Sequence, residues 1–241
     1  ERRPDVTEPE IQRAGLVGVV LEMLALGLGD PEDFPFIDPP PRRLLGEAWQ
    51  TLQELQAIDE GRRLTRIGQQ LARLPVDARH GRVLIEAHQR ACPADVLVLM
   101  AALSLPDVRE RPIDQQQAAD QAHQQFRVPS SDFLTLLKLW RWWQDVRKQN
   151  SRSQADRLAR KHFLSVSRLH EWGQLHGQLT QIARDERWPL KHAGSDGEDS
   201  IHRSLLSGLL GMIGQHQEKG EYQGARGHKF RLFPGSVLGQ R

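Results

Sequence analysis

The sequence predicts a mainly α-helical protein that ends in a few short β-strands. Apolar residues recur at helical spacing over most of the chain as far as about Gly214, which is the main evidence for helices. Beyond that point glycine and basic residues surround Tyr222, Phe230 and Leu232, a composition typical of strands joined by turns.

The first predicted helix starts at a capping box formed by Thr7 and Glu10. Gly27 or Gly29 ends it, because glycine adopts the left-handed conformation that closes many helices. Its apolar positions include Ile11, Leu16, Val20 and Leu24.

A loop follows, because residues 31–41 contain five prolines, and proline both fixes the backbone and lacks an N–H donor. Two aromatic side chains lie within this stretch, Phe34 and Phe36. We expect them to anchor the loop to the core.

Three elements between residues 44 and 75 follow the order of a winged helix. A helix is predicted over 44–55, a strand-turn-strand over 57–64, and a third helix from its cap at Thr65 to Pro75. The inward-facing positions are Leu45, Ala48, Leu52 and Leu55 in the second helix and Ile67, Leu71 and Leu74 in the third. Side chains of base-reading types on the third helix are Arg66, Gln69, Gln70 and Arg73. The sequence therefore leaves DNA reading by this unit open.

From residue 76 to about 214 the pattern is almost entirely helical. Helices are predicted at 80–90, 93–103, 115–126, 131–148, 154–184 and 200–213. A rigid polar connection is predicted over 104–112 and a flexible acidic loop over 194–199.

The last segment carries strand signals over 221–232 and a turn at Phe233-Pro234-Gly235-Ser236. Two strands alone are marginal in water, so we expect a β domain that continues past Arg241. The predicted domains are therefore 1–75, 76–214 and 215–241.

Composition indicates a soluble globular protein, with 38% hydrophobic and 27% charged residues among 241. Neither a signal peptide nor a membrane-spanning segment is predicted. A lone Cys92 excludes an internal disulfide, so we expect a cytoplasmic protein.

Charge is distributed unevenly, although the formal net charge is only +2. Residues 1–60 hold 13 acidic and 5 basic side chains, whereas residues 138–172 hold 9 basic and 3 acidic ones. Residues 201–241 hold 6 basic and 2 acidic side chains. This asymmetry fits an anionic partner or solvated helix faces about equally well.

Common catalytic motifs are absent from the sequence. It has no Walker phosphate loop, no D-E-x-H or D-E-x-D box and no G-x-S-x-G elbow. Its 10 histidines form neither H-E-x-x-H nor H-x-H, which favours scattered surface residues over a metal site. Cys92 precedes Pro93 in an apolar context and is interpreted as a core thiol.

Positive signals lie between residues 129 and 172. The hydroxyls of Ser130 and Ser131 lie at the start of a helix, where they serve as ordinary caps or help the free N–H groups to hold a phosphate.

This helix has two faces, an apolar one with Phe133, Leu137 and Trp140 and a basic one with Lys138, Arg141 and Lys148. Trp142 and Trp143 flank the boundary and either stack on bases or, together with Trp140, belong mostly to the core. Basic residues of the next helical stretch are Arg157, Arg160, Lys161 and Arg168. Such neighbouring basic helices would follow a phosphate backbone without reading sequence.

Several motifs together resemble the region after the motor domains of DEAH-box RNA helicases. They are T-E-P-E-I-Q-R at 7–13, A-L-G-L-G-D at 25–30, F-P-F at 34–36, L-T-R-I-G-Q-Q-L-A-R-L-P-V-D-A-R at 64–79 and S-S-D-F-L-T-L-L-K-L-W at 130–140. D-V-R-E-R-P at 107–112, R-L-H-E-W at 168–172 and Y-Q-G-A-R with F-P-G-S within 222–236 resemble the bacterial HrpA type.

This resemblance implies a winged helix, a helical ratchet bundle and an incomplete OB-fold. In the family these domains close over single-stranded RNA above two RecA-like motor domains, which drive 3′-to-5′ unwinding with ATP and Mg²⁺. The motor domains are absent from this sequence, so no catalytic residue, cofactor site or metal site is expected in it. We expect a monomer without membrane contact, whose partners are single-stranded RNA and those motor domains.

Carried over by position, the resemblance also implies nucleic-acid-binding residues. They are Arg109, Arg111, Ser130, Ser131, Asp132, Arg160, Ser165, Arg168, Lys229 and Arg231. Many relatives have His at Phe133, Cys at Ala159 and Asn at Ser165, which leaves the base or sugar contact at Ser165 open.

Three hypotheses follow. The first is an accessory RNA-binding part of a DEAH-box helicase. The second is a stand-alone winged-helix DNA-binding regulator with a helical interaction domain, although the basic residues of the later helices argue against it. The third, an uncharacterised enzyme, would need a cleft with perturbed titratable groups.

Overall fold

The computed structural model describes residues 15–194, 197–233 and 235–240. Two compact units divide these residues. The first contains the described residues up to Glu86 together with Arg203–Gly211, and the second contains those of Ala87–His202 and Met212–Arg241. The capping box predicted at Thr7 and Glu10 lies outside the described residues.

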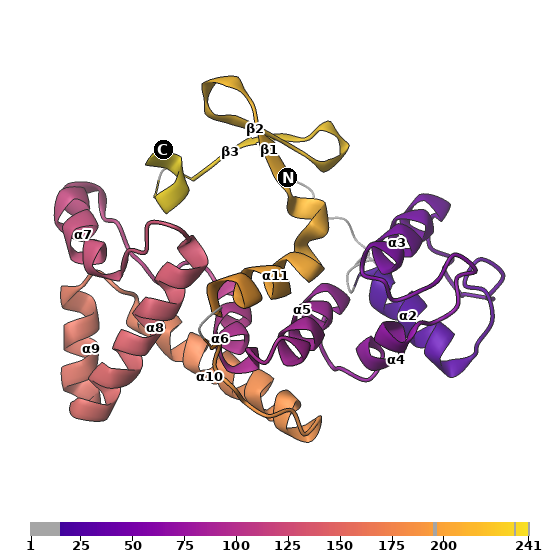
Figure 1. Cartoon of the computed structure of the whole chain (residues 1–241), viewed down its shortest axis with the longest axis horizontal. Coiled ribbons are helices and arrows are strands. Elements are labelled where there is room, and N and C mark those ends of the chain that lie inside the picture. Colours follow the sequence, from indigo (N-terminus) through magenta and orange to yellow (C-terminus); the bar gives the residue numbers. More distant parts are fainter. Residues whose placement is uncertain (1–14, 195–196, 234, 241) are drawn as a thin grey trace. The chain divides into compact units, whose positions relative to one another are not determined.

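The first unit contains α2 (Leu16–Leu26), α3 (Arg42–Glu54) and α4 (Arg66–Leu71) (Figure 1). Helices α2 and α3 pack together through fully buried positions such as Val20 and Leu52. Gly27 ends α2 at φ 67°, and the N–H of Leu28 donates to the Met23 carbonyl at 3.0 Å. This confirms the predicted glycine stop, because that backbone conformation costs glycine little.

The predicted loop after α2 is confirmed, but its anchors are only partly those expected. Phe34 and Phe36 pack against each other with ring centroids 4.8 Å apart, and both remain half-buried. Pro31 and Pro40, near the two ends of the loop, are the buried positions.

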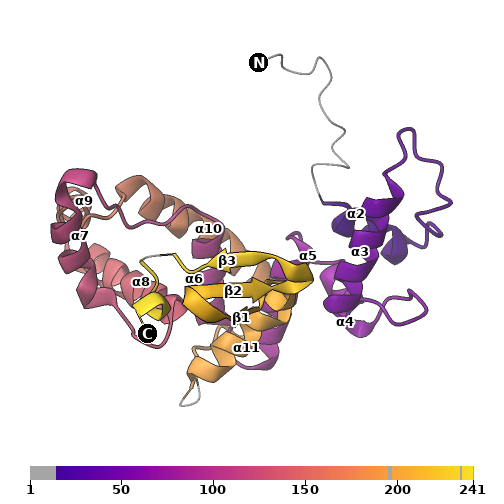
Figure 2. The same ribbon diagram turned by 90° about the horizontal axis from the view of Figure 1, so that it is seen from above.

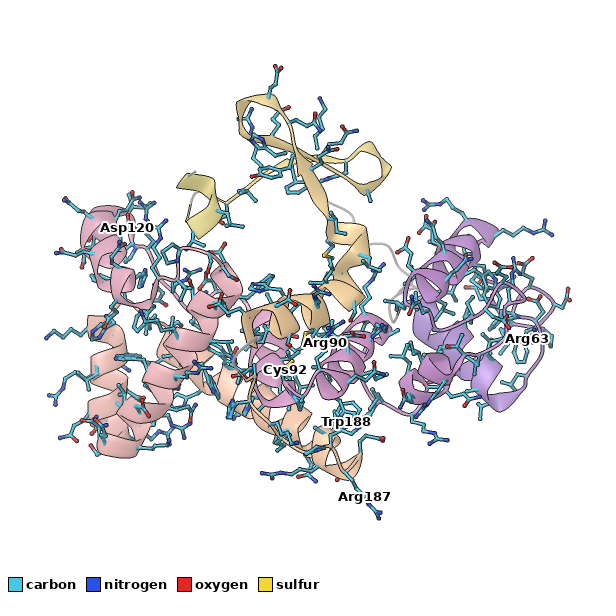
Figure 3. The ribbon with its side chains drawn as sticks, viewed as in Figure 1. Arg63, Arg90, Cys92, Asp120, Arg187 and Trp188 are labelled. Atoms are coloured by element: carbon cyan, nitrogen blue, oxygen red, sulfur yellow. The ribbon has the colours of Figure 1, made fainter. Side chains whose placement is uncertain are left out.

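The strand-turn-strand of the winged helix is confirmed in a reduced form, as a bridge between Ile58 and Leu64. The turn is closed by Asp59, whose carboxylate accepts hydrogen bonds from the backbone N–H and the Nε of Arg63 at 2.9 and 3.2 Å (Figure 3 labels Arg63). The hydrogen bond from the Arg63 backbone lowers the pKa of Asp59.

Helix α4 starts as predicted at Thr65, whose hydroxyl accepts a hydrogen bond from the Gly68 N–H at 3.1 Å. The glycine of the L-T-R-I-G motif is required here, because any Cβ at Gly68 would collide with the carbonyl oxygen of Ala57. Leu71 and Leu74 are buried as expected, while Ile67 is half-buried. The helix ends at Leu71, and turns rather than helix lead to Pro75.

Two of the three unit boundaries fall within helices, α5 (Ala78–Gln89) and α11 (Gly197–Leu209), and the third falls within the 3₁₀ turn after α11. The second unit further contains α6 (Pro93–Leu103), α7 (Gln116–His123), α8 (Asp132–Gln149), α9 (Arg152–Lys161) and α10 (Val166–Asp185). Short 3₁₀ turns flank α7 at Ile113–Gln115 and Gln124–Phe126, and another at Leu210–Met212 follows α11. Helix α6 packs against α8 and α10, and α8 packs against α9 (Figure 1).

The core of this unit is aromatic as well as aliphatic. Trp143, Trp172 and Phe126 are all at most 1% exposed. The Trp172 indole N–H donates to the Val98 carbonyl at 2.9 Å, which satisfies its polar atom inside the core. Cys92 is buried next to α6, as predicted for a core thiol (labelled in Figure 3).

The prediction of one helix over 154–184 was wrong. Helix α9 stops at Lys161 and α10 begins at Val166, with Phe163 between them at φ 53°. Leu164 there forms an antiparallel bridge with Arg109. Apolar spacing did not reveal the break, because Leu164 is as buried as a helical core residue would be.

The acidic loop predicted over 194–199 also needs correction. Residues 197–199 form the first turn of α11, which places Glu198 and Asp199 at its N-terminus. Negative side chains are favourable there because they face the positive end of the helix dipole. Residues 195 and 196 lie outside the described part of the chain.

The C-terminal strands form an antiparallel sheet of β1 (Gly214–His216), β2 (Glu221–Gly224) and β3 (Lys229–Arg231), in that order (Figure 2). The 3₁₀ turns Glu218–Gly220, Ala225–Gly227 and Val237–Gln240 lie between and after the strands. Strand β1 escaped prediction because G-Q-H shows no apolar alternation. The Phe230 ring packs directly on Gly214, where it leaves no space for a Cβ.

Among the described residues no helix is long and apolar enough to cross a membrane. Within the same residues, no three His, Cys, Asp or Glu side chains gather as metal ligands would.

Candidate nucleic-acid interface

The bridge between Arg109 and Leu164 assembles part of the predicted interface. The Glu110 N–H donates to the Phe163 carbonyl and the Ser165 N–H donates to the Val108 carbonyl, both at 2.8 Å. This pairing places Arg109 and Ser165, 56 residues apart in sequence, on adjacent strand-like segments.

Asp107 organises the arginines of this bridge. Its carboxylate receives Nη2 of Arg109 at 2.7 Å and Nε at 3.1 Å, while its carbonyl accepts Nη1 of Arg168 at 2.7 Å. Burial opposes the ionisation of Asp107, but the hydrogen bonds and charge of Arg109 lower its pKa overall. Burial likewise opposes the charge on Arg109, yet Asp107 and, less strongly, Asp132 raise its pKa. We call Asp107, Arg109, Ser165 and Arg168 the bridge cluster.

His123 of α7 borders the bridge cluster, a residue that sequence reasoning missed. Its Nε2 lies 3.1 Å from the Phe163 carbonyl. Burial, assisted by the charge of Arg109, lowers the pKa of His123, so the neutral ring is favoured. Asp107 was missed as well, although its place two residues before Arg109 in D-V-R was a usable signal.

Arg111 pairs with Asp120 of α7 through two hydrogen bonds of 2.8 and 2.7 Å (Figure 3 labels Asp120). The hydrogen bonds from Arg111 are the main cause that lowers the pKa of Asp120. Both side chains are about half exposed, at 54% and 53%, so water screens the pair and it contributes little stability.

The start of α8 is occupied by internal contacts. The hydroxyl of Ser131, a residue only 3% exposed, caps the Leu134 N–H at 3.4 Å and lies 2.7 Å from Nε2 of His202. The Asp132 carboxylate accepts hydrogen bonds from the C-terminal segment, and Ser130 is the exposed hydroxyl at this position. Ser131 and Asp132 therefore hold the fold together, whereas Ser130 faces solvent.

Helix α9 presents a basic face made by Arg157, Arg160 and Lys161. Its buried side is made by Ala155 and Ala159. Its exposed cationic side chains are Arg152, Arg157, Arg160 and Lys161. None of the four forms an ion pair within the described residues. Asp156, the acidic residue of this helix, forms a hydrogen bond of 3.1 Å with Nε2 of His170.

The tryptophans of α8 are mostly core, as one of the two interpretations held. Trp140 and Trp143 are buried, at 8% and 0% exposure. Trp142 is half-buried and packs with its ring centroid 5.1 Å from that of Phe126 and 4.9 Å from that of His162.

Lys229 and Arg231 are exposed on β3. Arg231 forms an exposed pair with Glu221 at 3.1 Å. Within the described residues, neither Lys229 nor Arg231 has a hydrogen bond or ion pair to the bridge cluster. The predicted site residues therefore fall into separate groups: the bridge cluster, the start of α8, the α9 face and the sheet.

Two protein-family models match adjacent parts of this chain. Residues 48–76 match the winged-helix model of the helicase-associated domain (HA2), and residues 77–136 match its ratchet-like model. The chain therefore carries the winged-helix and ratchet-like domains of the helicase-associated region.

Curated relatives similar to the chain include two HrpA helicases and a splicing helicase. The chain is 41% identical over 98% of its length to the ATP-dependent RNA helicase HrpA homolog of Haemophilus influenzae. It is 40% identical over 98% of its length to the ATP-dependent RNA helicase HrpA of Escherichia coli. It is 34% identical over 84% of its length to the pre-mRNA-splicing factor ATP-dependent RNA helicase prp22 of Schizosaccharomyces pombe. The chain spans 19%, 18% and 17% of these three relatives, respectively.

Proposed function

We propose that this chain is the RNA-binding accessory part of a DEAH-box helicase. In this role it guides single-stranded RNA over two motor domains during ATP-driven 3′-to-5′ unwinding, while ATP and Mg²⁺ bind to the motor domains. The relatives are described as ATP-dependent RNA helicases, which supports this class of function.

The observation that carries the proposal is the basic face of α9. Its three cationic side chains, Arg157, Arg160 and Lys161, have no ion-pair partner within the described residues, so they are available to an external polyanion. Binding to phosphates releases condensed counterions and does not depend on base sequence. A helicase accessory domain needs sequence-tolerant contacts of this kind.

The bridge cluster has a different role in this proposal. Arg109 is mostly buried, at 22% side-chain exposure, and both it and Arg168 are held by Asp107. These arginines supply a fixed positive potential beside the RNA path, whereas Arg160 contacts phosphate directly.

The alternative function, DNA reading by the winged helix, is supported by one observation. Arg66 and Arg73 are exposed and have no ion pair among the described residues. Helix α4 has only 6 residues, however, which offers less surface to a groove than the 10-residue α9 offers to a single strand.

A matched pair of double variants separates the two functions. Fluorescence anisotropy of the 241-residue chain would compare a single-stranded RNA with a DNA duplex at two salt concentrations. Arg157→Gln with Arg160→Gln is expected to weaken RNA binding about tenfold or more, because each contact to a charged group contributes about 1.5–3 kcal/mol. Arg66→Gln with Arg73→Gln removes the same charge from the winged helix.

RNA affinity that survives the α9 variant would refute the RNA-guiding role of this face. Tight duplex DNA binding that is lost only in the winged-helix variant would establish the alternative. Circular dichroism and thermal unfolding of both variants would show that the fold is retained.

A further inference from the structure

A polar pocket of about 340 Å³ lies where α8, α9 and α10 meet, and no function discussed above uses it. Its volume is near the lower end for small-ligand sites, ~300–1,000 Å³. Its polar lining residues are Arg147, Asn150, Arg152, Asp156 and His170, and Trp143 also lines it.

Two arginines converge on this pocket from consecutive helices. Arg147 lies in the last turn of α8 and Arg152 is the first residue of α9. Both are exposed, and neither has an ion pair within the described residues. The Arg147 guanidinium reaches across to α10, where a Cβ at Gly173 would lie 3.8 Å from its Nη1. Two uncompensated guanidinium groups beside one concave surface favour an anion.

The acidic side chain in the pocket lining already has a hydrogen-bond partner. Asp156, with a side chain 18% exposed, accepts a hydrogen bond from Nε2 of His170 at 3.1 Å. The two arginines therefore give the pocket lining a net positive charge.

Trp143 provides a spectroscopic reporter next to the pocket. Trp143 is fully buried, and its indole N–H donates to no acceptor within the described residues. Buried N–H groups are nearly always paired, and leaving one unpaired carries a desolvation cost. Trp143 also borders the pocket, so its indole signal can report on a ligand seated there, although the N–H itself is closed to solvent.

We infer that this pocket binds a phosphate group through Arg147 and Arg152. The guanidinium group of arginine forms paired hydrogen bonds with two oxygens of a phosphate. The first N–H groups of α9 add positive potential at the same place. Two sources share this chemistry, the backbone phosphate of a polynucleotide and a free phosphate or mononucleotide.

The test is a titration of the chain with inorganic phosphate at constant ionic strength, with chloride as the reference ion. Two-dimensional ¹H–¹⁵N NMR would follow the indole N–H signals of the 6 tryptophans, and Trp143→Phe would identify the relevant one. Line broadening of the ³¹P signal is a second readout, which needs no assignment if Trp143→Phe does not fold. We expect a saturable shift of the Trp143 signal and phosphate-dependent broadening.

Arg147→Gln with Arg152→Gln is expected to weaken both responses about tenfold or more. Arg187→Gln with Lys191→Gln removes the same charge at exposed positions outside the pocket and is expected to leave the phosphate responses intact. Lack of saturation, or equal responses in the two double variants, would overturn the inference.

A short single-stranded RNA then identifies the source. The same Trp143 shift with RNA assigns the site to a backbone phosphate, whereas a shift with phosphate alone assigns it to a free ion or mononucleotide. Loss of RNA binding in Arg157→Gln with Arg160→Gln bears on the proposed RNA function, so the two ideas can fail separately.

Discussion

The Asp132 carboxylate accepts a 2.6 Å hydrogen bond from the hydroxyl of Ser236, 104 residues further along the chain. The other carboxylate oxygen accepts the Val237 N–H at 3.0 Å. These two bonds tie the segment after the sheet to the first turn of α8, and we call them the C-terminal latch. A residue expected from the family resemblance to lie at RNA thus has a structural task.

Asp132→Ala should open the C-terminal latch. The change leaves the Ser236 hydroxyl and the Val237 N–H without their acceptor, and we expect a loss of about 1–3 kcal/mol in the free energy of unfolding. Hydrogen exchange at the Val237 amide should accelerate in the same variant. Asp145→Ala is the control, since its 65% exposed side chain lies 3.9 Å from Lys148 and should contribute almost nothing. Unaltered exchange at Val237 would show that the latch does not hold this segment in solution.

The salt dependence of RNA binding should report the α9 contacts directly. For single strands the slope of log affinity against log salt is about −0.7 for each phosphate contact. Arg157→Gln with Arg160→Gln should therefore reduce the magnitude of the slope by about 1.4. Anisotropy titrations at four salt concentrations would measure it, with Arg66→Gln and Arg73→Gln as the reference. Identical slopes in both double variants would mean that α9 makes no phosphate contact.

Two glycines of the first unit should respond in opposite directions to alanine. Gly68→Ala pushes a methyl group into the Ala57 carbonyl, so the backbone must shift, and we expect a loss of about 1–3 kcal/mol or more. Gly46 lies exposed in α3 with no atom within 4 Å of its Cβ position, so Gly46→Ala should gain about 0.5–1 kcal/mol. Urea denaturation monitored by circular dichroism would measure both. A Gly68→Ala protein as stable as the parent would contradict the close approach of α4 to the hairpin.

Acidification should destabilise the chain through two histidines. Burial lowers the pKa of His123 and His176 below the ordinary value of 6.5, and Arg109 contributes at His123. The unfolded chain therefore binds protons at a higher pH than the folded chain does. The stability that these histidines contribute is complete above about pH 7.5 and is lost progressively as the pH falls from 6.5 toward the lower pKa values of the folded chain.

His123→Gln should flatten this dependence between about pH 7.5 and 5, because glutamine does not titrate there and keeps a donor for the Phe163 carbonyl. His228→Gln, at an exposed position of the turn before β3, is the matched control. Urea denaturation at several pH values would measure the slope. If His123→Gln kept the slope of the parent, protonation of this buried ring would not be the cause.

Several helices and caps could be predicted from the sequence because the residues that determine them lie within a few positions of one another. Helix α6 has the bounds predicted from its apolar run, Pro93–Leu103. Gly27 and Thr65 end and begin helices as predicted, since each acts on backbone groups no more than four residues away. The order of helices and hairpin in the winged helix followed from the same local signals.

Tertiary structure alone decided the pairings of distant residues. The bridge between Arg109 and Leu164, the hydrogen bond from Arg168 to the Asp107 carbonyl, and the C-terminal latch each join groups far apart in sequence. Which of these polar groups meet depends on which segments are buried together, and periodicity does not encode that. The sequence by itself determined the helical fold class, its caps and its basic segments. Packing determined which of those charges are held inside the fold and which remain exposed on α9.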